Sequence, residues 1–130
     1  MKQIFVKSWK KSKQPRKQRK YQAHAPLHIK QKFMGAPLSK DLQKKYKIKT
    51  IGVRKDDKVK IMRGQFRKQT GKVVAVLLKR SRMFVEGAQR VKRDGTKVFY
   101  PLHPSNVQII EMVTTDKERM KRAEQGKEKK

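Results

Sequence analysis

Short apolar runs in the middle of the chain predict β-strands. Val59-Lys60-Ile61 alternates apolar and basic residues, and Gly71 precedes the long apolar run of Lys72–Leu78. Met83–Val85 is a third run, closed by Glu86-Gly87. Because β-branched runs bounded by turn residues are typical of strands, we expect three strands here.

The next segment predicts a hairpin and a last strand. Asp94-Gly95 suits a tight turn, since glycine tolerates positive φ angles, with Arg90–Arg93 and Lys97–Tyr100 as its arms. His103–Asn106 breaks the chain before the last strand, Val107–Glu111. Several short strands with short connections and no helix between them predict a small, partly open barrel.

The amino-terminal half predicts two short helices. Pro26 can open a helix that runs to Met34, where Gly35 ends it. Ser39 suits the N-cap of a second helix, with Asp41 in the first turn, where the helix dipole favours an acid. Leu42 and Tyr46 lie four residues apart on one face of this helix, which is enough to dock it on the barrel.

The two ends of the chain have a basic or mixed-charge composition without an apolar period. Residues 1–22 and 115–130 lack apolar residues to bury, so we expect both to be flexible in the absence of RNA. The chain then divides into a basic arm at 1–24, a short helical segment at 25–50, the barrel at 51–113 and a charged flexible tail at 114–130.

Charge points to a polyanionic partner. The 130 residues contain 38 Lys and Arg against 10 Asp and Glu, a net charge of +28, and 35% are hydrophobic. Residues 1–50 carry sixteen basic residues and one acid, a net charge of +15. Such a chain is expected to bind nucleic acid, and a large enzyme with a deep pocket is excluded.

Other classes of protein fit poorly. No apolar run approaches the ~18 residues of a membrane span, and cysteine is absent. An acid-free amino end can imitate a transit peptide, but Pro15 and the scarcity of serine argue against one, so we expect a cytoplasmic protein. His24 and His28 lie four apart with Pro26 between them, and no third ligand is near in sequence, so we expect no metal.

The carboxylates offer no catalytic arrangement. Asp56 and Asp57 are adjacent, so in a strand they face opposite sides and cannot act together. We interpret them as a loop-edge pair that balances Arg54 and Lys55. We therefore expect no enzyme activity, no cofactor and no small-molecule substrate.

The segment from Asp57 to Val76 predicts a hairpin with a basic loop. Its loop, Gly64–Thr70, would expose backbone N–H groups together with the side chains of Arg63, Arg67 and Lys68, a good device for contacting phosphates. The spacing is equally compatible with glycines that merely permit turns.

This segment resembles a KOW motif, and the chain resembles the archaeal and eukaryotic branch of a large-subunit ribosomal protein family. The family is numbered twenty-four in the bacterial and archaeal series and twenty-six in the eukaryotic series. Asp56 and Lys68 stand where the motif usually has glycine. The resemblance covers about Lys13 to Met112 and rests on the stretches Lys13–Lys20, Ala25–Ile29, Pro37–Tyr46, Val53–Asp57 and His103–Val107.

The resemblance implies a mainly β protein: a small SH3-like KOW barrel with a basic amino-terminal extension that contains two short helices, and a charged tail. It implies a structural constituent of the large subunit that binds large-subunit ribosomal RNA early in assembly. It further implies a place near the nascent-chain tunnel exit, beside neighbouring large-subunit proteins. A transcription-elongation regulator, which would act on RNA polymerase through a partner domain, and a chromatin-like DNA-binding protein are the alternatives.

Residues expected to contact RNA lie in the arm, the KOW loop and the barrel edge. An aromatic group in the arm can stack on unpaired bases, although a basic run also occurs in solvated tails and nuclear import signals. His103 is expected either to contact RNA or to cap its turn. The RNA-binding residues we expect are Lys10, Lys11, Lys13, Arg16, Lys17, Arg19, Lys20, Tyr21, His28, Lys55, Arg63, Arg67, Lys68, Lys72, Arg80, Arg82 and His103.

Overall fold

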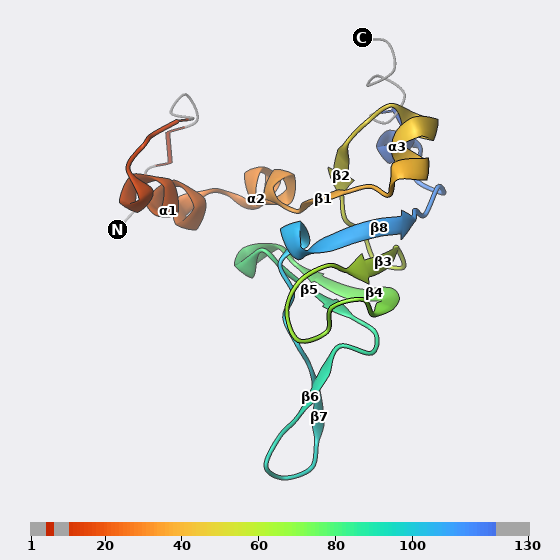
Figure 1. Cartoon of the computed structure of the whole chain (residues 1–130). Coiled ribbons are helices and arrows are strands. Elements are labelled where there is room, and N and C mark those ends of the chain that lie inside the picture. The colour runs from red at the N-terminus through yellow and green to blue at the C-terminus, as the bar shows by residue number, and fades with distance from the viewer. Residues whose placement is uncertain (1–4, 7–10, 122–130) are drawn as a thin grey trace.

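A computed structural model describes residues 5–6 and 11–121. Its centre is a four-stranded antiparallel sheet with the strand order β5-β4-β3-β8 (Figure 1). The strands are β3 (Lys58–Ile61), β4 (Thr70–Leu77), β5 (Arg82–Val85) and β8 (Val107–Glu111).

Two smaller antiparallel pairs accompany this sheet. β1 (Gly35–Pro37) pairs with β2 (Thr50–Gly52), and β6 (Gln89–Val91) pairs with β7 (Lys97–Phe99). The β1–β2 pair lies beside β8, because Leu38 forms a bridge with Ile109. In the described residues the strands form three open sheets and do not close into a barrel, so the protein is a small, mainly β domain.

Helices lie outside the sheets. The chain contains α1 (Pro15–His24), α2 (Leu27–Phe33), α3 (Lys40–Tyr46) and two 3-10 turns, η1 (Leu78–Arg80) and η2 (Pro104–Asn106). Figure 1 shows two projections from the body: α1 on one side and the β6–β7 hairpin below. Among the described residues, no helix combines the length and apolar character needed to cross a membrane.

One hydrophobic core joins the central sheet to the amino-terminal half. Residues from the two parts pack in one cluster, so the segment from Met34 to β2 belongs to the same folding unit as the sheet. At about 25 cal/mol per Å² of buried apolar surface, each such side chain contributes roughly 1.5–3 kcal/mol. Those at most 1% exposed include Met34, Ala36 and Leu38 from the first part and Val59, Ile61, Val73, Met83, Val85, Val107 and Ile109 from the second.

Most of the predicted elements are confirmed. Every predicted strand between Val59 and Glu111 is present, and so is the hairpin with its turn at Asp94-Gly95. α3 begins after Ser39, whose Oγ accepts a hydrogen bond from the Leu42 N–H at 3.4 Å.

Helix α1 and the strands β1 and β2 were missed. The arm was expected to be flexible, but residues 15–24 form α1; Pro15 stands at its start, where the missing N–H costs nothing, and Lys, Arg and Gln, all good helix formers, follow it. β1 and β2 were missed because three-residue strands that contain glycine or proline carry no readable alternation.

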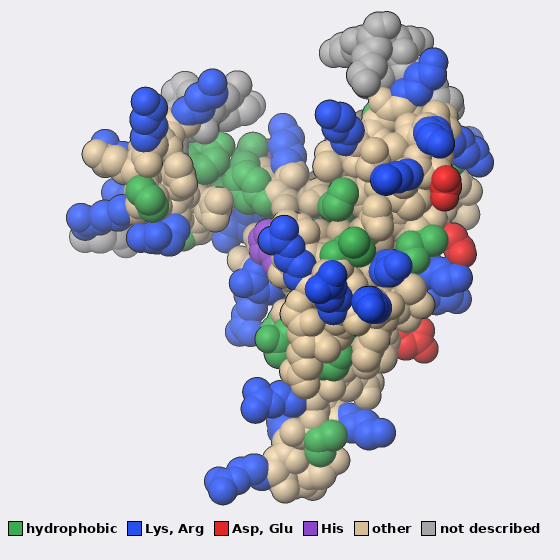
Figure 2. Space-filling view, in the orientation of Figure 1, with side chains coloured by type: hydrophobic (Ala, Val, Ile, Leu, Met, Phe, Trp, Pro, Cys, Tyr) green, Lys and Arg blue, Asp and Glu red, His purple; other side chains and the backbone are tan. Residues whose placement is uncertain are grey.

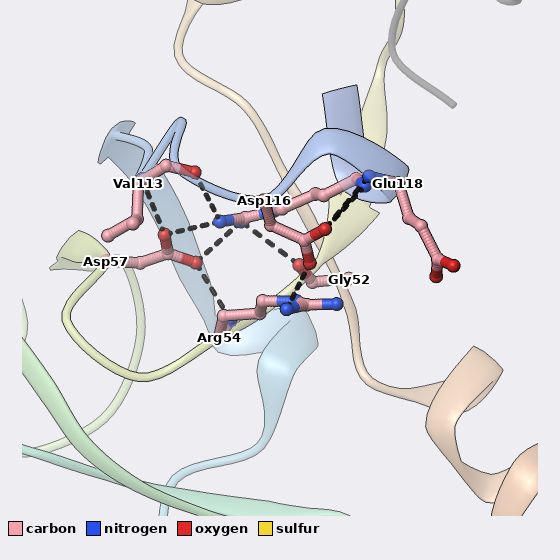
Figure 3. A network of polar contacts seen from close by, with 7 residues as sticks. Gly52, Arg54, Asp57, Val113, Asp116 and Glu118 are labelled. Atoms are coloured by element: carbon pink, nitrogen blue, oxygen red, sulfur yellow. Dashed lines mark hydrogen bonds and ion pairs between the residues drawn. The ribbon is translucent and has the colours of Figure 1, made fainter. Parts of the chain in front are cut away.

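The interpretation of Asp57 as a surface residue that balances its neighbours was wrong. Its side chain is fully buried and pairs with Arg119, which is 4% exposed. The Arg119 Nη1 and Nη2 atoms donate to the two carboxylate oxygens at 2.7 and 2.6 Å, and the N–H groups of Arg54 and Val113 donate to them at 2.8 and 3.0 Å (Figure 3). Four donors replace the water that this carboxylate loses on burial.

Asp116 holds the other side of this network. Its carboxylate accepts hydrogen bonds from the N–H groups of Glu118 and Arg119, which start the short helix at 117–121, and forms an ion pair with Arg54 (Figure 3). The hydrogen bond from the Arg119 N–H is the main cause that lowers the pKa of Asp116. The first part of the tail, which was expected to be flexible, is therefore docked on the domain. The sequence could not predict this, because Asp57 and Arg119 lie 62 positions apart.

Candidate nucleic-acid interface

The β3–β4 loop presents three exposed cations on a fixed backbone. Lys60 pairs with Thr70 across the hairpin, and the Lys68 N–H donates to the Ile61 carbonyl at 2.8 Å. Phe66 is buried beneath the loop, with its ring centroid 5.4 Å from that of Tyr100. The side chains of Arg63, Arg67 and Lys68 are exposed. We call these three side chains the loop cations.

The expectation that the loop offers its backbone N–H groups to phosphate was wrong at three positions. The N–H groups of Arg67, Lys68 and Gln69 donate to carbonyls inside the hairpin, those of Gly64, Ile61 and Phe66. The loop can therefore contact an anion at these positions with side chains rather than with the main chain.

Two residues that replace the motif's usual glycines keep the glycine backbone conformation. Asp56 has φ +68° and Lys68 has φ +74°, both in the left-handed region. A non-glycine residue there costs roughly 1–2 kcal/mol, and less for aspartate, which tolerates the region better. The hairpin thus keeps the path of the motif in spite of the substitutions.

Gly71 allows β4 and β5 to approach each other closely. A Cβ atom at this position would lie 2.3 Å from the backbone oxygen of Glu86 and 3.0 Å from a methyl group of Val85. The second glycine of the motif is therefore required by packing, which explains it without any role in binding. The interpretation of the glycines as structural residues holds at this position.

The arm carries exposed cations around a helix. Six basic side chains between residues 11 and 20 are exposed, and the first acid in the sequence is Asp41. Figure 2 shows Lys and Arg side chains standing out from the region of α1 in several directions. We call Lys11, Lys13, Arg16, Lys17, Arg19 and Lys20 the arm cations; the predicted Lys10 lies outside the described residues.

An aromatic cluster underlies the arm. Tyr21 on α1 is half-buried, with its ring centroid 5.0 Å from that of Phe5 and 6.2 Å from that of Phe33 on α2. Edge-to-face and tilted ring pairs of this kind stabilise a fold beyond the area they bury. Tyr21 thus links α1 to Phe5 and to α2.

His103 caps η2 and lies near Arg82. Its Nδ1 accepts a hydrogen bond from the Ser105 N–H at 3.3 Å, so the Nε2 atom carries the proton of the neutral ring. Burial, and then the charge of Arg82, lower the pKa of His103 from its usual 6.5. In the free protein the ring is therefore mostly neutral at pH 7, and it can offer a hydrogen-bond donor to a phosphate. The capping role is confirmed, and the RNA contact stays a prediction.

The remaining predicted residues lie on different elements. Lys55, Lys72 and Arg80 are exposed on the sheet domain, and His28 is exposed on α2. α2 packs against η1, where the Lys30 Nζ donates to the Lys79 carbonyl at 3.3 Å. The predicted cations are thus spread over many elements, which fits contact with an extended polyanion better than with a single ligand.

The sequence analysis missed the cations of the β6–β7 hairpin. This segment was interpreted as a turn, although its density of basic residues was a readable signal. All four of its basic side chains are exposed on the projection below the body (Figures 1 and 2). We call Arg90, Lys92, Arg93 and Lys97 the hairpin cations.

Among the described residues, no three His, Asp or Glu side chains group around a point that could hold a metal ion.

A comparison with protein families gives a match that spans most of the chain. The family model that describes the eukaryotic ribosomal proteins L26 and their archaeal counterparts of the L24 type matches residues 12–125. The match includes the arm, the central sheet and the segment that carries Arg119. It favours neither the elongation regulator nor the DNA-binding protein considered above.

Proposed function

The chain belongs to this family, and we propose that it binds large-subunit ribosomal RNA with its arm cations and its loop cations. Membership of the family makes it a structural protein of the large ribosomal subunit, located on cytoplasmic ribosomes. The two groups play different parts. The loop cations are held by the hairpin, whereas the arm cations follow a helix that projects from the body.

The observation that carries this proposal is the absence of acids beside the arm cations. The first forty residues of the sequence contain no carboxylate that could neutralise the arm cations. All six arm cations are exposed. Cations left unpaired in this way repel one another until an anion arrives, and RNA phosphates supply anions at a regular spacing. Further contacts with RNA would lie on the sheet domain, at His103, Arg82, Arg80, Lys55 and Lys72.

The family supports finer parts of the proposal. We propose that the open sheet is a form of the SH3-like KOW barrel, that the protein joins the subunit early in assembly, and that it lies near the tunnel exit beside other large-subunit proteins. We propose that the division at residues 24, 50 and 113 is a functional one, although Met34 and β1 share the core of the sheet.

A salt titration on a large-subunit RNA fragment tests RNA binding. Each phosphate contact contributes about 0.7 to the slope of log K against log salt on single strands and about 0.9 on duplex. With roughly eight to twelve contacts the slope is steep. Cosedimentation of the native protein with the large subunit is a separate test of its place in that subunit. A slope shallower than about three would overturn the proposal, because phosphate contacts would then not dominate.

A further inference from the structure

We propose that the arm contains a pocket for one unpaired RNA base, which rests on the proposed function and deepens it. The pocket, which we call the arm pocket, lies between residues 11–13 and the face of α1 that carries Gln18, Tyr21 and Gln22, with Phe33 of α2 completing its lining. It is an open hollow of about 660 Å³ on the surface of the arm.

The arm pocket is formed before any RNA binds. The Gln18 Nε2 donates to the Ser12 carbonyl at 2.6 Å, and the Gln14 N–H donates to the Ser12 Oγ at 3.1 Å. These two bonds fold the chain at Ser12 back over α1. Because Gln18, Tyr21 and Gln22 are spaced by three and four residues, they share one helix face and line the same hollow.

Aromatic rings form one part of the lining. Tyr21 and Phe33 meet edge to face, at a centroid distance of 6.2 Å and an interplanar angle of 60°. An aromatic ring that lines a pocket offers a stacking partner to a base, and stacking is worth about 1–3 kcal/mol per base. Bases in a duplex are already stacked on their neighbours, so the occupant is a base splayed out of a loop, bulge or single strand.

Polar groups suited to a nucleotide form the rest of the lining. Gln22 carries an amide with both donor and acceptor atoms, the combination that the edge of a base also presents. Lys11 and Lys13 add two cations to the lining, and these can contact the phosphates on either side of the base. Acidic side chains of a peptide would use these cations but not the aromatic rings, so a base is the better fit.

The test measures binding of the full chain to a single-stranded RNA octamer, an RNA duplex and heparin. Tyr21→Leu, which removes the ring but keeps an apolar side chain, should weaken octamer binding about tenfold with an unchanged salt slope. Binding to duplex and heparin should stay as in the unchanged protein. Lys17→Ala is the matched control: it should weaken all three and lower the slope by about one.

Two further variants separate recognition from folding. Tyr21→Phe keeps the ring and should bind the octamer normally, and circular dichroism should show the same helix content in all variants. Gln22→Ala should reduce discrimination between octamers of different base composition. The proposal is overturned if Tyr21→Leu leaves octamer binding unchanged, weakens heparin binding equally, or if polyglutamate displaces the octamer as readily as unlabelled RNA does. If the unchanged protein binds none of the RNAs, the proposed function itself fails.

Discussion

The two basic hairpins of this protein differ in how much of the fold supports them. In the hairpin of β3 and β4, the inward side chains Val59, Ile61 and Val73 are at most 1% exposed, and Phe66 anchors the loop. In the hairpin of β6 and β7, every residue from Gln89 to Val98 is exposed, and Phe99 alone stacks on the body, with its ring 5.8 Å from that of Phe84.

The two hairpins carry similar charge, but the backbone that positions this charge is better supported in the β3–β4 hairpin. Each hairpin carries at least three cations near its turn, so composition alone makes them equivalent. Fixing a flexible residue costs about 1–2 kcal/mol, and a two-stranded hairpin without a covered face is marginally stable. We therefore expect the β3–β4 loop to give more affinity per charge.

The largest effect should come from the glycines of the two hairpins. Gly71→Ala places a Cβ atom against the backbone oxygen of Glu86 and should cost about 3 kcal/mol or more, enough to abolish the cooperative thermal transition. Gly95→Ala is the matched control: Gly95 has φ +83° and nothing within 4 Å of the added atom. Its cost of about 1–2 kcal/mol should stay local to the hairpin and scarcely move the midpoint. Equal midpoints would contradict the comparison.

Amide exchange should separate the hairpins by a factor on the order of 100 or more. The Ile61 N–H donates to the Gln69 carbonyl and the Lys92 N–H to the Thr96 carbonyl, both at 2.9 Å. Similar bonds in a buried and an exposed hairpin should open with very different free energies. Residue-resolved exchange on the free protein measures this, and similar protection at Ile61 and Lys92 would show that the β6–β7 hairpin is as firmly held.

A third comparison replaces three cations in each hairpin. Arg63, Arg67 and Lys68 changed together to Ala should weaken binding of an RNA fragment about tenfold more than Arg90, Lys92 and Arg93 changed together. Each triple variant removes the same charge, so the two salt slopes should fall equally if all three residues contact phosphate. Filter binding at several salt concentrations measures both quantities. If the loop variant binds like the unchanged protein, the β3–β4 hairpin is scaffold alone.

The smallest effect concerns strain in the β3–β4 loop. Lys68→Gly should raise the free energy of unfolding by about 0.5–1 kcal/mol, because glycine accepts the φ of +74° without steric cost. Lys68→Ala removes the same charge but keeps the strain, so it should leave stability nearly unchanged. Urea unfolding of both variants measures the difference. A destabilised Lys68→Gly protein would show that strain at this position is negligible.

Local pattern predicted the elements whose signal is contained in a few neighbouring residues. The alternation of Val59-Lys60-Ile61, the Ser39 cap and the Asp94-Gly95 turn each specify their structure within a few positions, and each is confirmed. The cations of the candidate interface were equally readable, since a basic side chain tends to stay exposed wherever it lies.

Long-range packing decided what the sequence did not reveal. The β1–β2 pair exists because Ala36 and Leu38 complete the core beside Ile109, a contact between distant parts of the chain. The arm pocket depends on a turn at Ser12, which hydrogen bonds from Gln14 and Gln18 hold. No period of apolar residues encodes either feature.

The pair of Asp57 and Arg119 also sets an order of events during synthesis. The two residues are 62 positions apart, so at ~5–20 residues per second a ribosome makes the second roughly 3–12 s after the first. Throughout that interval the carboxylate has no guanidinium partner, and β3 lacks β8 on its open edge until Glu111 has followed. The nascent chain therefore holds an incomplete sheet during this interval, and Asp57 can be buried with its partner only after Arg119 has been made.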